Sequence, residues 1–467
     1  MLNKLSIAIK TANQKSFLRK TALLTTSAAT LAMMSMVPGV SAQEGAAPVE
    51  EIMITGIRGA LKTAIDVKRN SEAVVDAISS EDIGKMPDKN VADSLSRVPG
   101  VQIQKGLTGE GSRVAIRGTD PELTYAVLNG QQVATTDWFV LAPQGRSFNF
   151  DLMPSEMVKG LEVYKSPMAR LTEGGVGGTV IMNTRRPLEL DANTFYASVE
   201  GNYTDLADES NASFGGLGSW KNSSETFGIL AAVSSNKEAG IGNRGENYMS
   251  WGAGSAHFAQ ERERLALDVT AQFAPVEGLD IVAHYFSTET TADNTNHNFL
   301  LIPGRSTLVT ASADGQSGSV IDSGGDPIWQ NDIFYRQSEI KSDLFDLDAK
   351  YEGEGYTLHG QVGTTDSTGG TQLEAGAGFT DRTSASWDTS GNSVNLVPVT
   401  AIDTANMEWF SGSLSRTPRE AEHTYGQFDV LFDTELGAVK SLETGIRATT
   451  YEYTKDKYAG TTPTTAT

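Results

Sequence analysis

Beyond about residue 190 the chain alternates apolar and polar residues over segments close to ten residues long. The segments 194–203 and 264–273 follow this pattern over their whole length. Strict alternation is the signature of a β-strand, because successive side chains point to opposite faces of a sheet. Ten residues is also about the length of a strand that crosses a membrane in a barrel. Further candidate strands are 226–234, 279–288, 344–352, 355–365, 424–432 and 440–450.

The two faces of these strands differ sharply in polarity. In one segment Phe345 and Leu347 point one way, while Asp346 and Asp348 point the other. An antiparallel barrel with an apolar exterior and a polar lumen has this pattern, and so does a soluble β-sandwich with its apolar face inside. Alternation alone does not separate the two, but segment length favours the barrel. The polar stretch 291–340 is expected to be the longest loop.

The first 42 residues have the parts of a secretory signal peptide. Five positive charges lie within residues 1–20, an apolar run covers 21–37, and Val40-Ser41-Ala42 forms a small-residue cleavage site. The alternative is a membrane anchor, but Thr and Ser dilute a run that is shorter than about 20 apolar residues. We expect cleavage after residue 42, and therefore export.

Composition removes several classes of function. The net charge of −21 argues against a nucleic-acid partner, and signal-peptide cleavage makes the balance more negative. The absence of Cys removes disulfide frameworks, thiolate metal sites and a cysteine nucleophile.

Residues 43–58 are expected to form a periplasmic tail that carries one isolated β-prone run. The part 43–50 is small, polar and contains proline, whereas 51–57 (EIMITGI) favours a strand. A lone strand can add to the edge of another protein's sheet through its main chain. The alternative is an ordinary edge strand of the next domain.

Residues 59–190 are typical of a compact α+β unit. Asp88 precedes a helical pattern that Pro99-Gly100 stops, and 113–117 alternates as a strand. Asn129-Gly130 between two β-prone runs predicts a hairpin with a type I′ turn. Two more strands are expected near 160–165 and 178–184, and periodicity leaves open whether 74–78 is strand or helix.

Three motifs in order resemble the TonB-dependent outer-membrane receptors. EEIMITG at 50–56 resembles a TonB box, RVAIRGTDPELTYAVLNGQQV at 113–133 the core of the plug domain, and MVKGLEVYKSPMARLTEGGVGGTVIMNTRRP at 157–187 its second signature. The stretches GIRGALKTAIDVKRN and VVDAISSEDIGKMPDKNVADSLSRVPGVQI are similar to a branch of the family that is often linked to oligosaccharide uptake. The resemblance is close over about residues 50–190. In the barrel portion that follows, only the general character of the sequence resembles the family.

The resemblance implies a membrane β-barrel with an N-terminal α+β plug domain, divided as signal peptide 1–42, tail 43–58, plug 59–190 and barrel 191–467. It implies transport of a bulky solute, and the implied partners are TonB with its inner-membrane complex, outer-membrane lipid and a small-molecule or oligosaccharide ligand. The implied TonB-binding residues are Glu51, Ile52, Met53, Ile54, Thr55 and Gly56. The implied plug motif comprises Arg117, Gly118, Asn129, Gly130, Gly174, Gly175, Gly177 and Gly178. Ferric-siderophore uptake and a secreted β-rich binding or adhesion protein are the alternatives.

The substrate is expected to meet the apical loops of the plug. Asp137, Trp138 and Phe139 form the most suggestive segment, because a ring can stack on a sugar while a carboxylate accepts bonds from hydroxyls. The alternative is that the two rings anchor the loop against the lumen wall. The plug cations are expected to pair with carboxylates of the barrel; they are Arg113, Arg117, Lys165, Arg185 and Arg186.

No catalytic or metal-binding constellation is recognisable. The five histidines show no paired-ligand spacing, and each is more typical of a strand or loop residue than of a zinc ligand. Asp346 and Asp348 share a face and could do acid–base work, but lumen lining is the simpler interpretation. We therefore expect no enzyme activity and no cofactor.

The length sets a further expectation. A plugged barrel of 22 strands of about ten residues would use most of residues 191–467 before any loop is counted, yet about eight strands are clear. The chain also ends in TTPTTAT rather than in a strand with a terminal aromatic residue. We expect a complete plug and the N-terminal part of a barrel.

Overall fold

The computed structural model describes residues 64–69, 71, 73–79, 90–138, 147–247, 252–305, 307–437 and 439–462. The expected signal peptide, the tail with Glu51–Gly56, and Phe139 lie outside the described residues. Among the helices that are described, none combines the length and the apolar character needed to cross a membrane.

The first part of the described chain is built on a mixed five-stranded sheet. Its strand order is β1-β6-β7-β4-β5, in which only the β4–β7 pair is parallel. The strands are β1 (Val75–Ser79), β4 (Thr124–Leu128), β5 (Gln131–Gln132), β6 (Val158–Tyr164) and β7 (Gly178–Thr184). Periodicity left open whether 74–78 is strand or helix, and β1 shows that residues 75–78 of this stretch are a strand.

A short helix and a two-stranded sheet complete this unit. Helix α4 (Val91–Leu95) begins at Asn90, whose side-chain oxygen accepts a hydrogen bond from the Asp93 amide. The predicted helix is thus confirmed, in shorter form. Strand β3 (Gly111–Ile116), predicted at 113–117, pairs with β2 (Val101–Lys105).

The hairpin between β4 and β5 has the predicted turn. Asn129 and Gly130 have φ of 50° and 92°, the left-handed pair that a type I′ turn requires. Asn tolerates this region because its short polar side chain bonds locally, and here it bonds Thr184 of β7.

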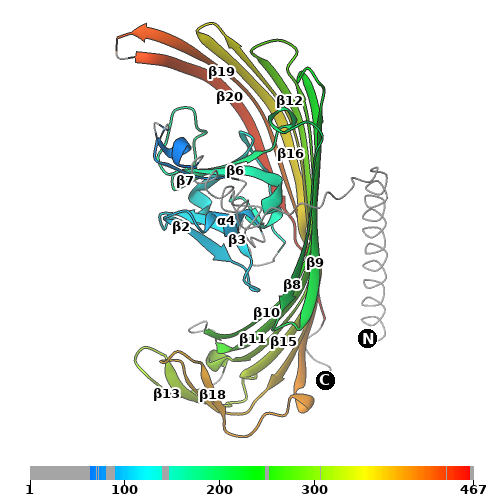
Figure 1. The fold of residues 1–467 in the computed structure, drawn as a ribbon. Coiled ribbons are helices and arrows are strands. Elements are labelled where there is room, and N and C mark those ends of the chain that lie inside the picture. The colour runs from blue at the N-terminus through cyan, green and yellow to red at the C-terminus, as the bar shows by residue number, and fades with distance from the viewer. Residues whose placement is uncertain are drawn as a thin grey trace, which may run out of the picture. The chain divides into compact units, whose positions relative to one another are not determined.

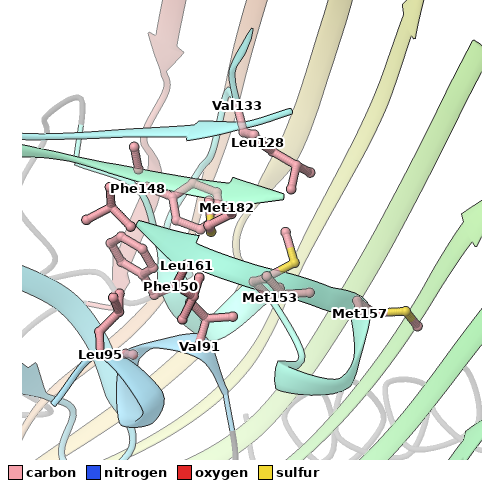
Figure 2. Packing of buried hydrophobic residues seen from close by; sticks show 14 of the residues in the cluster. Val91, Leu95, Leu128, Val133, Phe148, Phe150, Met153, Met157, Leu161 and Met182 are labelled. Atoms are coloured by element: carbon pink, nitrogen blue, oxygen red, sulfur yellow. The ribbon is translucent and has the colours of Figure 1, made fainter. Parts of the chain in front are cut away.

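The apolar core lies on one face of the five-stranded sheet. Leu161 and Met182 of the sheet lie beside Phe148 and Phe150 in one cluster with Val91 and Leu95 of α4, and Leu128 belongs to the same cluster (Figure 2). All are at most 4% exposed, and the two phenylalanine rings meet edge to face at 4.9 Å.

The second part of the chain is a long antiparallel sheet that curves beside the five-stranded unit (Figure 1). Its order is β20-β19-β16-β15-β12-β11-β10-β9-β8, with β21 also paired to β19. The bounds are β8 (Thr194–Thr204), β9 (Glu209–Lys221), β10 (Phe227–Asn247), β11 (Ala253–Phe273), β12 (Leu279–Leu301), β15 (Trp329–Gly353), β16 (Tyr356–Asp381), β19 (Glu408–Leu436), β20 (Val439–Lys455) and β21 (Tyr458–Thr462). We call this sheet the wall and the preceding unit the plug.

Most wall strands are longer than their alternating segments. Residues 291–301 continue β12 and 329–340 belong to β15, so the loop expected over 291–340 is in fact confined to 302–328. Strand β9 was not among the expected strands. The extensions of β12 and β15 and the strand β9 are largely polar on both faces. They therefore carry little of the apolar alternation by which a sequence pattern would detect a strand.

Parts of two long connections form a separate four-stranded sheet. Its order is β13-β14-β17-β18, with bounds Thr307–Ala311, Ser317–Ile321, Ala385–Asp388 and Asn395–Pro398. The remaining short 3-10 turns are Pro121–Leu123, Phe150–Leu152, Ser155–Met157, Pro187–Glu189, Pro303–Arg305 and Thr404–Asn406.

The wall is apolar outside and polar inside. Phe345 and Leu347 are 49% and 41% exposed, whereas Asp346 and Asp348 on the same strand are 1% and 7% exposed because the plug covers them. A β-sandwich would bury the apolar set instead. The predicted fold class, an antiparallel β-barrel wall with an α+β plug, is confirmed.

The inward face is not polar throughout. Leu230, Phe286 and Leu344 point inward, are at most 2% exposed, and belong to the same buried cluster as the plug core. The plug is therefore held partly by apolar packing and partly by the polar contacts described next.

Candidate functional site

The plug hairpin is held at its tip by three wall strands. The Gln361 side chain of β16 donates to the Asn129 carbonyl at 2.7 Å, and Arg447 of β20 donates to the Gly130 carbonyl at 3.3 Å. Nδ2 of Asn129 lies 3.2 Å from Nδ1 of His284 on β12. A turn needed for the plug's own fold is therefore also a docking point on the wall.

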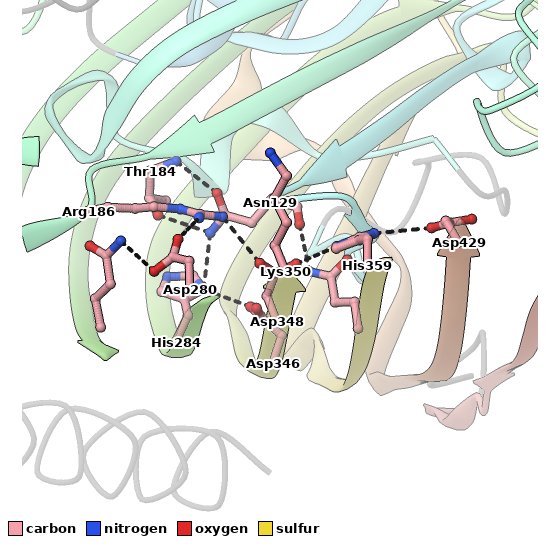
Figure 3. A network of polar contacts seen from close by, with 12 residues as sticks. Asn129, Thr184, Arg186, Asp280, His284, Asp346, Asp348, Lys350, His359 and Asp429 are labelled. Atoms are coloured by element: carbon pink, nitrogen blue, oxygen red, sulfur yellow. Dashed lines mark hydrogen bonds and ion pairs between the residues drawn. The ribbon is translucent and has the colours of Figure 1, made fainter. Parts of the chain in front are cut away.

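An ionic network surrounds this docking point (Figure 3). Arg186, just beyond β7, pairs with Asp280 at 3.0 Å and with Asp348 at 3.5 Å. His359 lies between Asp348 at 2.6 Å and Asp429 at 3.1 Å. The network thus links the end of the plug sheet to four successive wall strands, β12, β15, β16 and β19.

His284 is enclosed by two carboxylates of the wall. Its Nε2 lies 3.1 Å from Asp268 and its Nδ1 lies 2.9 Å from Asp346, and all three side chains are at most 2% exposed. Asp346 and Asp348 are thus lumen-lining residues that hold histidines, as the simpler interpretation of their alternation predicted. Nothing in the sequence pattern marked His284 or His359 as their partners.

A second, more deeply buried ion cluster joins the plug to the wall nearer the long connections. Arg262 of β11 bonds Asp151 of the plug at 2.7 Å and Glu238 of β10 at 2.8 Å. Arg264 donates to the Asp151 carbonyl. All these side chains are at most 10% exposed, so each charge is stabilised by its ion-pair partners rather than by water.

Asp137 lies in the plug segment that approaches the wall, and its partner belongs to the plug. Arg113 contacts Asp137 and also pairs with Glu122 at 3.1 Å. Burial raises the pKa of Asp137 above its ordinary value of 3.8, and the Arg113 charge opposes that shift.

Trp138 is buried rather than exposed. It is 8% exposed and packs with Leu152, Phe258 and Ile340 in a small apolar cluster. Its carbonyl accepts a 2.7 Å bond from Thr371 of β16. This position favours the anchoring interpretation of the ring over stacking on a sugar in the present conformation.

Glycine is required at the positions of the plug motif for two different structural reasons. Gly118, Gly174 and Gly178 have positive φ, and so does the non-glycine Arg117 at 55°. Gly175 and Gly177 do not, but a Cβ on Gly177 would collide with Thr119 Oγ1. Tight packing therefore explains these two, and positive φ explains the others.

The expected pairing of plug cations with the wall is seen as a salt bridge for Arg186, and Arg185 also interacts electrostatically with Asp268 of β11. Arg113 and Lys165 pair with carboxylates of the plug, and Arg117 and Arg185 donate to plug carbonyls. For Lys165 the reason is that Asp76 of the plug lies beside it.

A cavity of about 900 Å³ lies between the second face of the plug sheet and the wall. Tyr125, Asn183 and Arg186 line it from the plug, and Lys350, Gln361 and Arg447 from the wall. Its volume is within the usual range for ligand sites. In the described part of the chain no group of His, Asp or Glu side chains is arranged to hold a metal ion.

Comparison with known proteins agrees with this architecture. Residues 67–179 match the family of the TonB-dependent Receptor Plug Domain. The vitamin B12 transporter BtuB of Photobacterium profundum is 26% identical over 113 residues, which cover 24% of this chain and 18% of that protein. The match therefore spans less than a fifth of that relative's length.

Solved structures with similarity include the siderophore receptor PirA from Acinetobacter baumannii, with 13% identity and a TM-score of 0.31 over 85% of this chain and 78% of that one. A mutant of the ferric enterobactin receptor PfeA from Pseudomonas aeruginosa has 11% identity and a TM-score of 0.39 over 84% and 72%. From the matched family and the observed fold we conclude that the chain resembles the TonB-dependent outer-membrane receptors and that residues 67–179 are their plug domain.

Proposed function

We propose that the intact protein is a TonB-dependent active transporter of the outer membrane that imports a bulky solute, an oligosaccharide by our assignment. The observation that supports this most is the inverted polarity of the wall, with Phe345 exposed and Asp346 covered by the plug. A secreted β-rich binding protein has no reason to expose its apolar face to water. A lipid bilayer accepts that face, and a plug closes the lumen.

The proposal assigns a role to each part of the chain. Residues 1–42 direct export, and Glu51–Gly56 in the tail 43–58 binds TonB by adding a strand to its sheet. The plug 59–190 closes the barrel that begins at about residue 191. TonB and its inner-membrane complex supply the energy, and the barrel is surrounded by outer-membrane lipid.

Asp137, Trp138 and Phe139 remain the candidate substrate contacts at the apical side of the plug. Because Trp138 is 8% exposed, stacking on a sugar requires its ring to leave the pocket formed by Leu152 and Phe258. Replacing Trp138 by Leu keeps an apolar side chain in the pocket but removes the ring, whereas Trp138→Ala empties it. If Trp138 contacts sugar, both variants lower surface affinity; if it only anchors the loop, the Leu variant binds normally.

The coupling mechanism is tested at Ile54 in the full-length protein in its outer membrane. Ile54→Pro removes a main-chain donor and prevents strand addition, whereas Ile54→Val keeps a β-prone residue. We expect the Pro variant to bind labelled solute at the surface but not to import it, and the Val variant to do both. Import by the Pro variant would contradict TonB coupling.

The solute panel separates the remaining alternatives. It contains neutral oligosaccharides of glucose, xylose and N-acetylglucosamine together with ferric siderophores. Ile54-dependent import of a siderophore alone would favour the siderophore alternative. Absence of the protein from the outer-membrane fraction would favour the secreted alternative.

A further inference from the structure

Beside the docked hairpin, the plug and the wall share a cluster of side chains that carry buried polar atoms without hydrogen-bond partners. Both amide atoms of Gln131 and the hydroxyl of Tyr425 lack a partner within the described residues, whereas the His423 ring interacts with the Gln132 main chain. Nε and one terminal nitrogen of Arg447 also lack a partner there. Gln131 and His423 are fully buried, and Tyr425 is 6% exposed.

These side chains are close neighbours. The rings of His423 and Tyr425 are stacked with centroids 5.9 Å apart and planes 16° apart, and the Arg447 guanidinium lies 4.7 Å from the Tyr425 ring centroid. A Cβ built on Gly363 would collide with Gln131 Oε1 and would lie 2.9 Å from Cε1 of Tyr425. The missing side chain of Gly363 thus provides the room in which the Gln131 amide and the Tyr425 ring meet.

The cluster continues along the inward face of the last two wall strands. Tyr451 of β20 is the cross-strand neighbour of His423, with ring centroids 6.3 Å apart. In the next rows, Tyr425 faces Thr449, and Gln427 faces Arg447, which also lines the 900 Å³ cavity. From the cavity toward His423, the inward face of β19 and β20 therefore carries aromatic rings and polar atoms in consecutive rows.

The other buried histidine of the inward face, His284, lies between two carboxylates. Each buried polar group without a partner costs about 1–3 kcal/mol, and such groups are few in folded proteins. Gln131, Tyr425 and Arg447 bring such atoms together at one place, where a bound solute would satisfy them.

The chemistry of the free atoms restricts what would satisfy them. Arg447 only donates, but Gln131 Oε1 accepts, and the Tyr425 hydroxyl can do either. An anionic chelate offers acceptors only and would leave Gln131 Oε1 unpaired. A sugar hydroxyl donates and accepts, and the faces of its ring stack on aromatic side chains.

We propose that Gln131, His423, Tyr425 and Arg447 form a deep contact site for a neutral polyhydroxylated solute, an oligosaccharide, on its way past the plug. The inference rests on the proposed transport function and assigns residues that contact its substrate inside the lumen. The plug hairpin covers the site in the present conformation, because Gln361 and Arg447 hold the Asn129–Gly130 turn. The solute reaches the site once this turn leaves the wall.

The test measures uptake by the full-length protein in its outer membrane, with the same panel of neutral oligosaccharides and ferric siderophores. Gln131→Met keeps the volume but removes the hydrogen bonds, and Tyr425→Leu removes the ring. We expect each to lower the import rate of the imported oligosaccharide about tenfold, while surface binding at the apical side is unchanged. Phe428→Leu, on the same strand but 48% exposed on the outer face, is the matched control and should import normally.

Heat-modifiable migration checks that each variant is folded. If Tyr425→Leu does not fold, Tyr425→Phe retains the ring and loses only the hydroxyl, and a smaller drop of about threefold is expected. Normal oligosaccharide import by Gln131→Met and Tyr425→Phe would overturn the site. Ile54-dependent import of ferric siderophores alone would also overturn it, while leaving the transport function intact. If no solute enters in an Ile54-dependent way, the transport function itself fails and the site fails with it.

Discussion

Nδ1 of His284 lies 3.2 Å from the side-chain nitrogen of Asn129 in the plug and 2.9 Å from the Asp346 carboxylate in the wall. Asn129 uses its oxygen to accept from the Thr184 amide, so its nitrogen is the donor toward the histidine. A single ring nitrogen either donates to Asp346 or accepts from Asn129, but not both at once. Whether Asn129 and His284 form a hydrogen bond is therefore tied to the position of one proton, whereas the Gln361 and Arg447 bonds to the same turn are not.

Asn129 can be tested for its two roles, in the turn and in docking. Asn129→Gly removes the side-chain bonds but suits the φ of 50°, whereas Asn129→Ala removes them and adds left-handed strain. We expect the Ala variant to be less stable than the Gly variant by about 1–2 kcal/mol. Hydrogen exchange of the β4 and β5 amides measures this, and equal protection in the two variants would contradict it.

Two motif glycines should differ in their tolerance of alanine. At Gly118, with φ of 74°, a Cβ meets nothing within 4 Å, so Gly118→Ala should cost only about 1 kcal/mol of backbone strain. At Gly178, with φ of 152°, it would lie 2.7 Å from the Tyr164 carbonyl oxygen. We expect a clearly larger loss for Gly178→Ala in the urea midpoint of the plug; similar midpoints would refute the steric argument.

The two ion clusters should respond differently to loss of their arginine. Arg262→Met leaves Asp151 and Glu238 buried without their cation and should cost about 3–5 kcal/mol. Arg186 is 35% exposed, and Arg186→Met should cost no more than about 1 kcal/mol. Proteolysis of the plug under mild denaturant reports both, and the prediction fails if Arg186→Met loosens the plug more.

Acid should loosen the first plug strand through Asp76. Burial acts to raise the pKa of Asp76, but hydrogen bonds from Lys165 and Lys68 outweigh it and hold the pKa below 3.8. A lowered carboxyl pKa stabilises the fold above its ordinary value, and this stability is lost as pH falls through the lowered value. We expect exchange at β1 to accelerate below about pH 4 in the native protein but not in Asp76→Asn.

The outer face should reject charge. Leu347 is 41% exposed on the outer face of the wall, which the proposed function places in lipid, and Leu347→Arg should cost up to about 2–4 kcal/mol if it lies near the middle of the membrane. The control Leu347→Val keeps an apolar β-branched residue and should assemble normally. The folded fraction in the outer membrane, measured by heat-modifiable migration, decides; an unaffected Arg variant would argue against a lipid-facing position.

Local patterns predicted local structure well. Asn129-Gly130 predicted the type I′ turn, and alternation predicted strands at 194–203 and 264–273, because these depend on a few adjacent residues. The ends of the wall strands were not predictable, since their extensions are held by cross-strand pairing rather than by an apolar face. Strand β16, for example, runs to Asp381 although its alternating part ends near 365.

Charge partners were the least predictable feature. Arg113 and Lys165 were expected to meet the wall and instead meet plug carboxylates, because proximity in three dimensions selects among many acidic residues. The contacts of Asp346 and Asp348 with histidines could not be predicted from the sequence pattern either, since His284 and Asp346, for example, are 62 residues apart.

The sequence by itself determined the alternating strands, the hairpin turn and the plug motif that matches a known family, since each is encoded by neighbouring residues. Only the tertiary structure decided that the apolar face of the wall points outward and that the polar face meets the plug. Alternation defines two faces but not which one is covered. It also decided that Gln131 and Tyr425, 294 positions apart in the numbering, meet beside Gly363 with unsatisfied polar atoms, because only folding brings the plug hairpin against the wall.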